Sequence, residues 1–127
     1  NIPYLIDSGN VQYCEAIYVE NNNVHIAGSS LSKYFGNLEA CYWKNGVKTT
    51  LLPRNNFGDP YSQTHDIIVD HGDVYITGYI SDIGAVYWKN GKVIALESNN
   101  STSSEAYKIF IDQSDIYICG YVDGVAV

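Results

Sequence analysis

The strongest constraint on this chain is an internal repeat. The motif Tyr-Trp-Lys-Asn-Gly occurs at residues 42–46 and again at residues 87–91. A second motif, in which Ile, a small residue and Gly follow a Tyr or a His, occurs three times and ends at Gly28, Gly78 and Gly120. The spacing is 50 residues from Gly28 to Gly78 and 42 residues from Gly78 to Gly120. A repeat of this length indicates one supersecondary unit that is used several times.

Each repeat is expected to form four short strands, named a to d in chain order. Strand a has the pattern Ile-x-Val-Asp or a close variant and lies at residues 17–20, 67–70 and 109–112. Strand b ends at the recurring Gly, and strand c ends in Tyr-Trp. Asn-Gly then turns the chain into strand d, for example at residues 92–96. Asn-Gly between two apolar segments is typical of a β-hairpin, because both residues tolerate the positive φ of a type I′ turn.

The length and content of the repeat predict the fold class. Four strands at a period of roughly 40–50 residues are typical of a β-propeller blade. No 3.6-residue apolar periodicity appears, which excludes a helical solenoid. The sequence therefore predicts an all-β fold, a β-propeller segment of about three four-stranded antiparallel blades in the strand order d-abcd-abcd-abc. We expect residues 1–127 to form this one segment, with blade boundaries near residues 12, 62 and 104, within a ring of about six to eight blades.

The chain begins and ends inside a repeat. Residues 2–6 align with strand d, and Ala126 and Val127 align with the start of strand c. Both terminal strands would then lack a partner, which leaves backbone N–H and C=O groups unpaired. We therefore expect further propeller blades as partners, either from a longer parent chain or from copies that associate head to tail as a homo-oligomer.

Two recurring residue types predict how the blades pack. Trp43 and Trp88 occupy the same place in strand c, where we expect them to pack between neighbouring blades. The recurring Gly at the end of strand b indicates a bulge or a close approach of two backbones, because a side chain would not fit there.

The repeat motifs also resemble those of a known group of proteins. Residues 106–127, together with residues 85–96, resemble repeats of secreted β-propeller proteins from Bacteroidetes-type bacteria, which carry the Tyr-Trp-Lys-Asn-Gly blade motif. The resemblance covers nearly the whole chain. It implies an extracellular or cell-envelope location and says nothing about a ligand.

Charge and cysteine content limit the partners. Lys and Arg number 7 against 14 Asp and Glu, a net charge of -7, which argues against nucleic acid and against an anionic membrane surface. No apolar run approaches the roughly 18 residues of a membrane span. Cys14, Cys41 and Cys119 are odd in number and widely spaced, which argues against a disulfide framework or a zinc site. We expect all three to be small buried residues.

The sequence offers few candidates for catalysis. It contains no Gly-x-Ser-x-Gly motif and no glycine-rich phosphate loop, so we predict no catalytic residue and no cofactor. No metal site is predicted either, because an extended strand would hold His65 and His71 about 20 Å apart. The carboxylates Glu20, Asp70 and Asp112 recur at the end of strand a, where they either cap the next turn or line a channel that holds a cation.

Loop length identifies the face where a ligand is expected. The connection from b to c shortens from 12 residues between Gly28 and Ala40 to 6 between Gly120 and Ala126, and the d-to-a connections also vary. Both kinds of loop emerge on one side of an antiparallel blade, and variable loops on a rigid scaffold commonly carry binding sites. The candidate binding residues in or beside these loops are Tyr34, Phe35, Arg54, Phe57, Tyr61, Tyr79 and Tyr121. The alternative is that these side chains only pack their loops onto the blades.

These observations favour a non-catalytic binding or scaffold module whose ligand, a glycan or a protein, lies on the variable-loop face. Two alternatives stay open. The chain could be a fragment of a secreted carbohydrate-active propeller enzyme, with two carboxylates drawn from different blades. It could also be a purely structural, self-assembling unit.

Overall fold

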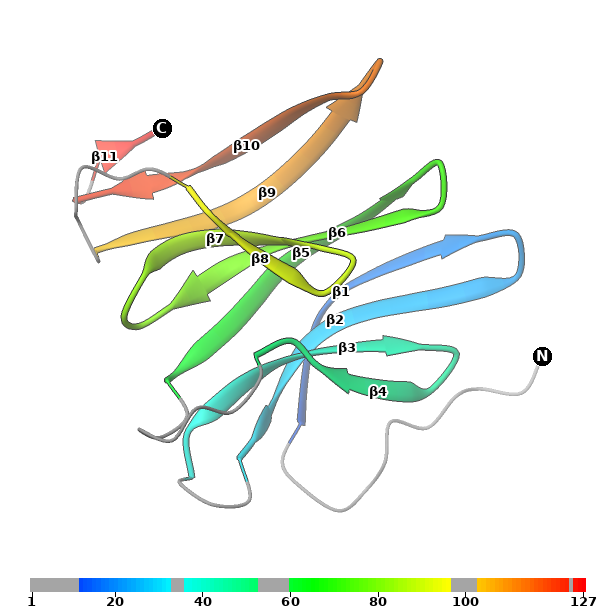
Figure 1. The fold of residues 1–127 in the computed structure, drawn as a ribbon, viewed down its shortest axis with the longest axis horizontal. Coiled ribbons are helices and arrows are strands. Elements are labelled where there is room, and N and C mark those ends of the chain that lie inside the picture. Colours follow the sequence, from blue (N-terminus) through cyan, green and yellow to red (C-terminus); the bar gives the residue numbers. More distant parts are fainter. Residues whose placement is uncertain (1–11, 33–35, 53–59, 97–102, 124) are drawn as a thin grey trace.

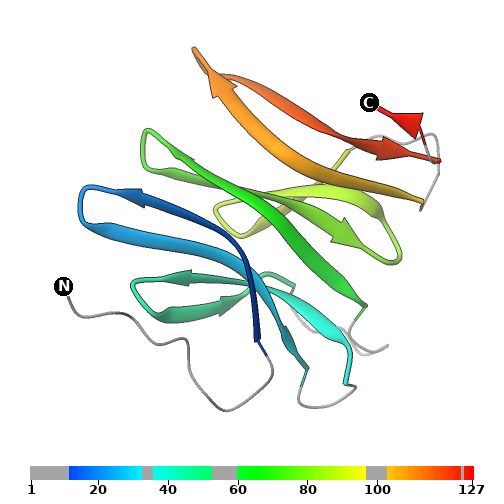
Figure 2. The same cartoon turned by 180° about the vertical axis from the view of Figure 1, so that it is seen from behind.

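The computed structural model describes residues 12–32, 36–52, 60–96, 103–123 and 125–127. These residues form three antiparallel sheets that follow one another along the chain and stack side by side (Figures 1 and 2). Sheet 1 contains β1 (Gln12–Glu20), β2 (Asn23–Leu31), β3 (Leu38–Lys44) and β4 (Val47–Thr50). Sheet 2 contains β5 (Ser62–Asp70), β6 (Asp73–Ile80), β7 (Gly84–Lys89) and β8 (Lys92–Ala95). Sheet 3 contains β9 (Ser104–Asp112), β10 (Asp115–Val122) and β11 (Val125–Ala126).

The strands within each sheet pair in chain order, so each sheet is an up-and-down blade. The first strand of a sheet packs on the sheet before it: β5 contacts β1, β2 and β3, and β9 contacts β5, β6 and β7. The all-β propeller segment that the repeat predicts is therefore confirmed. The additional strand d expected at residues 2–6 lies outside the described residues.

The hairpin turns follow from residues that accept a positive φ. Asn45 and Gly46 adopt 50° and 84°, and Asn90 and Gly91 adopt 50° and 82°, as a type I′ turn requires. The Asn side chain has a second role that the sequence did not reveal. Its Oδ1 accepts a hydrogen bond from a backbone N–H of the second strand, at 2.8 Å from Val24 to Asn45 and 2.9 Å from Val74 to Asn90.

The main core lies between sheets 1 and 2. Trp88, which is 0% exposed, packs in one cluster with Ala27 and Ala40 of sheet 1 and with Ile76 of its own sheet. The prediction of inter-blade packing is thus correct for Trp88. Trp43 is equally buried but belongs to a smaller cluster within sheet 1.

The recurring glycines mark close backbone contacts, as the sequence suggested. A Cβ built on Gly78 would overlap the carbonyl oxygen of Gln63 on the neighbouring strand and lie 2.9 Å from Cζ3 of Trp88. Gly28 has the same relation to Tyr13 and Trp43. Glycine is therefore needed at this position because the backbone carbonyl of the first strand lies where a side chain would begin, and in sheets 1 and 2 the indole also packs there.

Two buried serines join neighbouring sheets. The Ser62 Oγ accepts a hydrogen bond from the backbone N–H of Ala40 at 2.9 Å, and the Ser104 Oγ accepts one from Ala85 at 2.9 Å. Each serine is the first residue of its sheet and is fully buried. The repeat thus carries its own inter-sheet hydrogen bond.

The expectation for the cysteines is partly wrong. Cys41 is buried, whereas Cys14 and Cys119 are exposed. Cys14 pairs with Gly28 on the face of sheet 1 that is turned away from sheet 2, and Cys119 lies on the face of sheet 3 opposite Gly120. Cys14 lies in the edge strand β1, whereas Cys41, on the same face of sheet 1, lies in the inner strand β3. Within the described residues, no further sheet covers the face of sheet 3 that carries Cys119.

Candidate functional site

The predicted binding residues fall into two groups. Tyr34, Phe35, Arg54 and Phe57 lie outside the described residues. Tyr61 precedes β5, Tyr79 lies near the end of β6, and Tyr121 lies near the end of β10, so these three share the end of the sheets where the variable loops emerge. The structure brings Tyr61 and Tyr79 together, with ring centroids 6.3 Å apart and planes tilted by 60°.

Tyr121 and three further side chains form a second group, which lies close enough to this pair that, after burial, the Glu105 charge also raises the pKa of Tyr61. The two groups together span sheets 2 and 3. The Tyr107 ring lies 6.0 Å from the Tyr121 ring and 4.8 Å from the His65 ring, measured between centroids. Glu105 contacts both His65 and Tyr121. We call these six residues the tyrosine cluster: Tyr61, His65, Tyr79, Glu105, Tyr107 and Tyr121.

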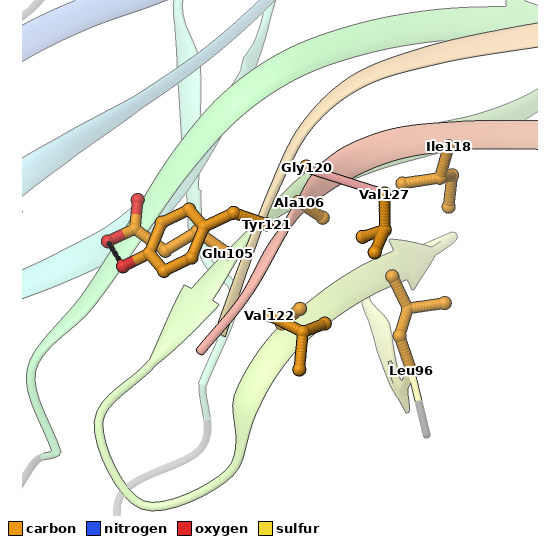
Figure 3. Close-up of a pocket in the computed structure, with 9 residues that line it drawn as sticks. Leu96, Glu105, Ala106, Ile118, Gly120, Tyr121, Val122 and Val127 are labelled. Carbon is orange, nitrogen blue, oxygen red and sulfur yellow. Dashed lines mark hydrogen bonds between the residues drawn. The ribbon is translucent and has the colours of Figure 1, made fainter. Parts of the chain in front are cut away.

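Glu105 links the members of the cluster. Its Oε1 accepts a hydrogen bond from the Tyr121 hydroxyl at 3.3 Å, a contact that Figure 3 shows. Its Oε2 lies 3.0 Å from Nε2 of His65, which comes from the neighbouring sheet. Both carboxylate oxygens therefore take part in orienting cluster side chains.

A β-bulge in the first strand of each sheet helps to position the cluster. The pairing register shifts between Cys14 and Ala16 in sheet 1, and the equivalent shifts leave His65 in sheet 2 and Tyr107 in sheet 3 as the extra residue. A bulge re-aims the side chain that it carries. His65 and Tyr107 thus come from the same repeat position of adjacent sheets and meet each other.

The cluster is accessible and holds its phenols in the protonated form. The Tyr61 and Tyr107 side chains are 37% and 39% exposed. Burial raises the pKa of Tyr61 and of Tyr107, and the negative charge of Glu105 adds to the effect. The pKa of Tyr121 is raised first by the Glu105 carboxylate and then by burial. At neutral pH the hydroxyls of these three tyrosines are therefore protonated, and that of Tyr121 donates to Glu105.

The opposite end of the sheets carries a polar cavity of about 400 Å³ whose charged groups pair with one another. Lys89 Nζ lies 3.3 Å from Oδ2 of Asp73, and His71 Nδ1 lies 2.9 Å from Oδ2 of Asp70. Among the described residues, no group of three or more His, Cys, Asp and Glu side chains could hold a metal ion. The tyrosine cluster is the better candidate, because its partners leave aromatic surface exposed.

Reasoning from sequence missed three members of the cluster. His65, Glu105 and Tyr107 lie in strands, whereas the variation in loop length points to residues in the loops. An alignment of the repeats contains the missing signal, because His65 and Tyr107 share one repeat position and Glu105 pairs across the sheet with Tyr121. The recurring Gly marks the bulge in the sequence, because the register shifts lie opposite Gly78 and Gly120, but it does not show which side chain the bulge carries.

Comparison with known proteins adds no relative: no protein-family model, curated protein or solved structure matches the chain. Across the described residues, no helix is long and apolar enough to cross a membrane.

Proposed function

We propose that this chain is a non-catalytic β-propeller binding module and that its tyrosine cluster binds a glycan. The observation that carries the proposal is the Glu105 carboxylate, which joins a Tyr and a His from two sheets beside two exposed Tyr rings. A sugar presents apolar C–H faces and hydroxyl edges. Aromatic rings can pack on the apolar faces, and carboxylate and phenol groups can form hydrogen bonds with the hydroxyls. Ligand sites commonly combine apolar walls with a few polar groups in this way.

The composition of the cluster supports binding rather than glycoside hydrolysis. Hydrolysis of a glycosidic bond commonly uses two carboxyl groups, roughly 5–10 Å apart. Of the six side chains in the cluster, Glu105 alone is a carboxylate, and its two oxygens already engage Tyr121 and His65. A carboxylate held in this way is suited to orienting neighbouring donors.

The module is proposed to work beside further blades, from a longer chain or from other copies, in a ring of about six to eight. We place it outside the cytoplasm or in the cell envelope, on the resemblance of its Tyr-Trp-Lys-Asn-Gly repeats to those of secreted propeller proteins. Neither statement is needed for the tyrosine cluster to bind a ligand.

A glycan array screened with the 127-residue chain, followed by calorimetry on each hit, tests the proposal. Tyr107→Ala removes an exposed ring, and Glu105→Gln removes the acceptor charge while keeping its size. We expect each variant to bind at least about tenfold more weakly, which corresponds to about 1.4 kcal/mol. Phe110→Ala is the matched control, because Phe110 lies on the same strand as Tyr107 and is 63% exposed.

Two results would contradict the proposal. One is glycan binding that both cluster variants retain at full strength. The other is the absence of any glycan hit together with a protein ligand whose binding depends on Tyr107, which would assign the cluster to protein recognition.

A further inference from the structure

The bulge in the first strand recurs in all three sheets, but the side chain that it carries differs each time. The extra residue is Glu15 in β1, His65 in β5 and Tyr107 in β9. The residues on either side of the bulge pair in the same register in every sheet, so the backbone is repeated while the side chain is not. Bulges re-aim a side chain and are frequent beside functional sites. His65 and Tyr107 already belong to the tyrosine cluster, and Glu15 is the third member of this row.

Glu15 lies at the boundary of sheets 1 and 2, both of which the structure describes. The first strands of the three sheets lie side by side, because β5 contacts both β1 and β9 (Figure 2). Burial does most to raise the pKa of Tyr61, and the charges of Glu105 and, more weakly, of Glu15 add to the effect. Tyr61 therefore lies within electrostatic reach of a carboxylate on either side.

Tyr61 is held firmly between the cluster and Glu15. Its backbone carbonyl accepts a hydrogen bond from the N–H of Ser81 at 2.9 Å, and the next residue, Ser62, accepts one from Ala40 of sheet 1 at 2.9 Å. The Tyr61 ring is 37% exposed and packs against Tyr79. An aromatic surface thus extends from the tyrosine cluster towards sheet 1.

The two carboxylates beside Tyr61 differ in their partners. Both oxygens of Glu105 are engaged within the cluster. Glu15 is exposed and, in the part of the chain that the structure describes, has no hydrogen bond and no ion pair. Its carboxylate can accept hydrogen bonds from ligand hydroxyls without giving up a native contact. Tyr13, two residues earlier on β1, is 48% exposed and adds a second aromatic ring.

We propose that Glu15, with the rings of Tyr13 and Tyr61, forms a second sugar subsite, so that the ligand is an uncharged oligosaccharide that spans all three sheets. This inference rests on the proposed binding of a glycan at the tyrosine cluster. Sheets that pack face to face lie about 10 Å apart, so roughly 20 Å separates the bulge of sheet 1 from that of sheet 3, which is more than one sugar unit covers. The negative charge of both carboxylates disfavours an acidic sugar.

A series of chain lengths tests this inference. The probes are uncharged oligosaccharides of the cello, manno, malto and chito series, and their binding to the 127-residue chain is measured by calorimetry. We expect the affinity to rise at least about tenfold from the shortest to the longest oligomer that binds, as one charge-assisted hydrogen bond more would give. Glu15→Ala should abolish this rise and leave the shortest oligomer unaffected, whereas Glu105→Gln should weaken every length.

Asp115→Ala is the matched control, because it removes an exposed carboxylate at the opposite end of the sheets and should change nothing. Should Glu15→Ala fail to fold, Glu15→Gln removes the same charge at nearly the same size and should reduce the rise. Three results would overturn the inference: equal affinity at every length, a rise that the Glu15 variants retain, or tighter binding of oligogalacturonate than of any uncharged probe. If Tyr107→Ala still weakens binding, these results leave the proposed function intact. Binding that is insensitive to Tyr107→Ala would contradict the proposed function itself, and no binding of any probe would overturn the inference as well.

Discussion

The second strands of sheets 2 and 3, β6 and β10, have nearly the same sequence pattern and very different surroundings. Each pairs with the strand before it in the same register, up to the bulge beside Gly78 or Gly120. Yet Tyr75 is 7% exposed and its counterpart Tyr117 is 56% exposed. The difference arises because sheet 3 packs on the face of β6 that carries Tyr75, whereas within the described residues no sheet covers the face of β10 that carries Tyr117. Within one repeat the sequence determines strand and register, whereas burial depends on the neighbouring blade.

The largest expected effect is at the residue that fills the space between sheets 1 and 2. Trp88→Ala should lower the free energy of unfolding by about 3–5 kcal/mol, because it leaves a cavity lined by both sheets. The variant would make this interface resemble the one between sheets 2 and 3, where a mostly apolar pocket of about 100 Å³ lies beside Ile118 (Figure 3). Urea unfolding of both proteins measures the change, with Phe110→Ala as an exposed aromatic control. A loss no larger than that of the control would show that the indole is not a packing residue.

A pair of matched substitutions tests the comparison of β6 and β10 directly. Ile76 is buried and Ile118 is half-buried at the same repeat position. Ile76→Ala should cost about 2–5 kcal/mol of stability, and Ile118→Ala about 1 kcal/mol or less, because the second site already borders an open pocket. Equal losses in urea unfolding would mean that the environment of β10 is as closed as that of β6.

The inter-sheet serines are expected to behave alike, in contrast to the isoleucines. Ser62→Ala and Ser104→Ala each leave a buried backbone N–H without its acceptor, which should cost about 1–3 kcal/mol. Similar losses of stability in thermal unfolding would show that the two sheet interfaces are equally tight around Ser62 and Ser104. A much smaller loss for Ser104→Ala would indicate that sheet 3 is only loosely attached.

Much of the fold could be predicted because the signals are local. The Asn-Gly turns, the alternation in strand b and the spacing of Gly28, Gly78 and Gly120 depend on residues close together in the chain. Trp88 could be placed between blades for the same reason, because its position in the repeat determines on which face of the sheet its side chain lies. The inter-sheet role of Ser62 could not be predicted, because it depends on the backbone N–H of Ala40, which is 22 residues away in the chain.

The candidate site was harder to predict, because it depends on contacts between repeats. The position of Tyr61 and Tyr79 beside the loops predicts their place in the site, and the structure brings them together. His65 and Glu105, which lie 40 residues apart, meet only when two sheets stack. The burial predicted for Cys14 is wrong because the residue type does not show that it lies in the edge strand β1, whereas the buried Cys41 lies on the same face in the inner strand β3.

The smallest expected effect concerns the second residue of the strand-b motif, which is His25 in β2 where β6 and β10 have Tyr. His25 is 2% exposed, its Nδ1 lies 2.7 Å from the Tyr42 hydroxyl, and Glu20 is 3.7 Å from its Nε2. Burial lowers the pKa of His25 from its ordinary value of 6.5, against the opposing effect of Glu20. The folded state thus favours the neutral ring, while the unfolded state takes up a proton below pH 6.5.

The sign of the pH effect follows from this difference. Stability from His25 is complete above pH 6.5 and is lost as the pH falls from there towards the lower pKa of the folded state. His25→Tyr, which restores the residue found in the other repeats, should flatten the dependence in urea unfolding between about pH 7.5 and pH 5.5. His71→Gln is the control: a hydrogen bond to Asp70 raises the pKa of this exposed ring, so its small contribution is present below pH 6.5 and fades as the pH rises. An acid-induced loss of stability that His25→Tyr leaves unchanged would assign the effect to the carboxylates. The replacement of Tyr by His in β2 would then have no effect on the pH dependence of stability.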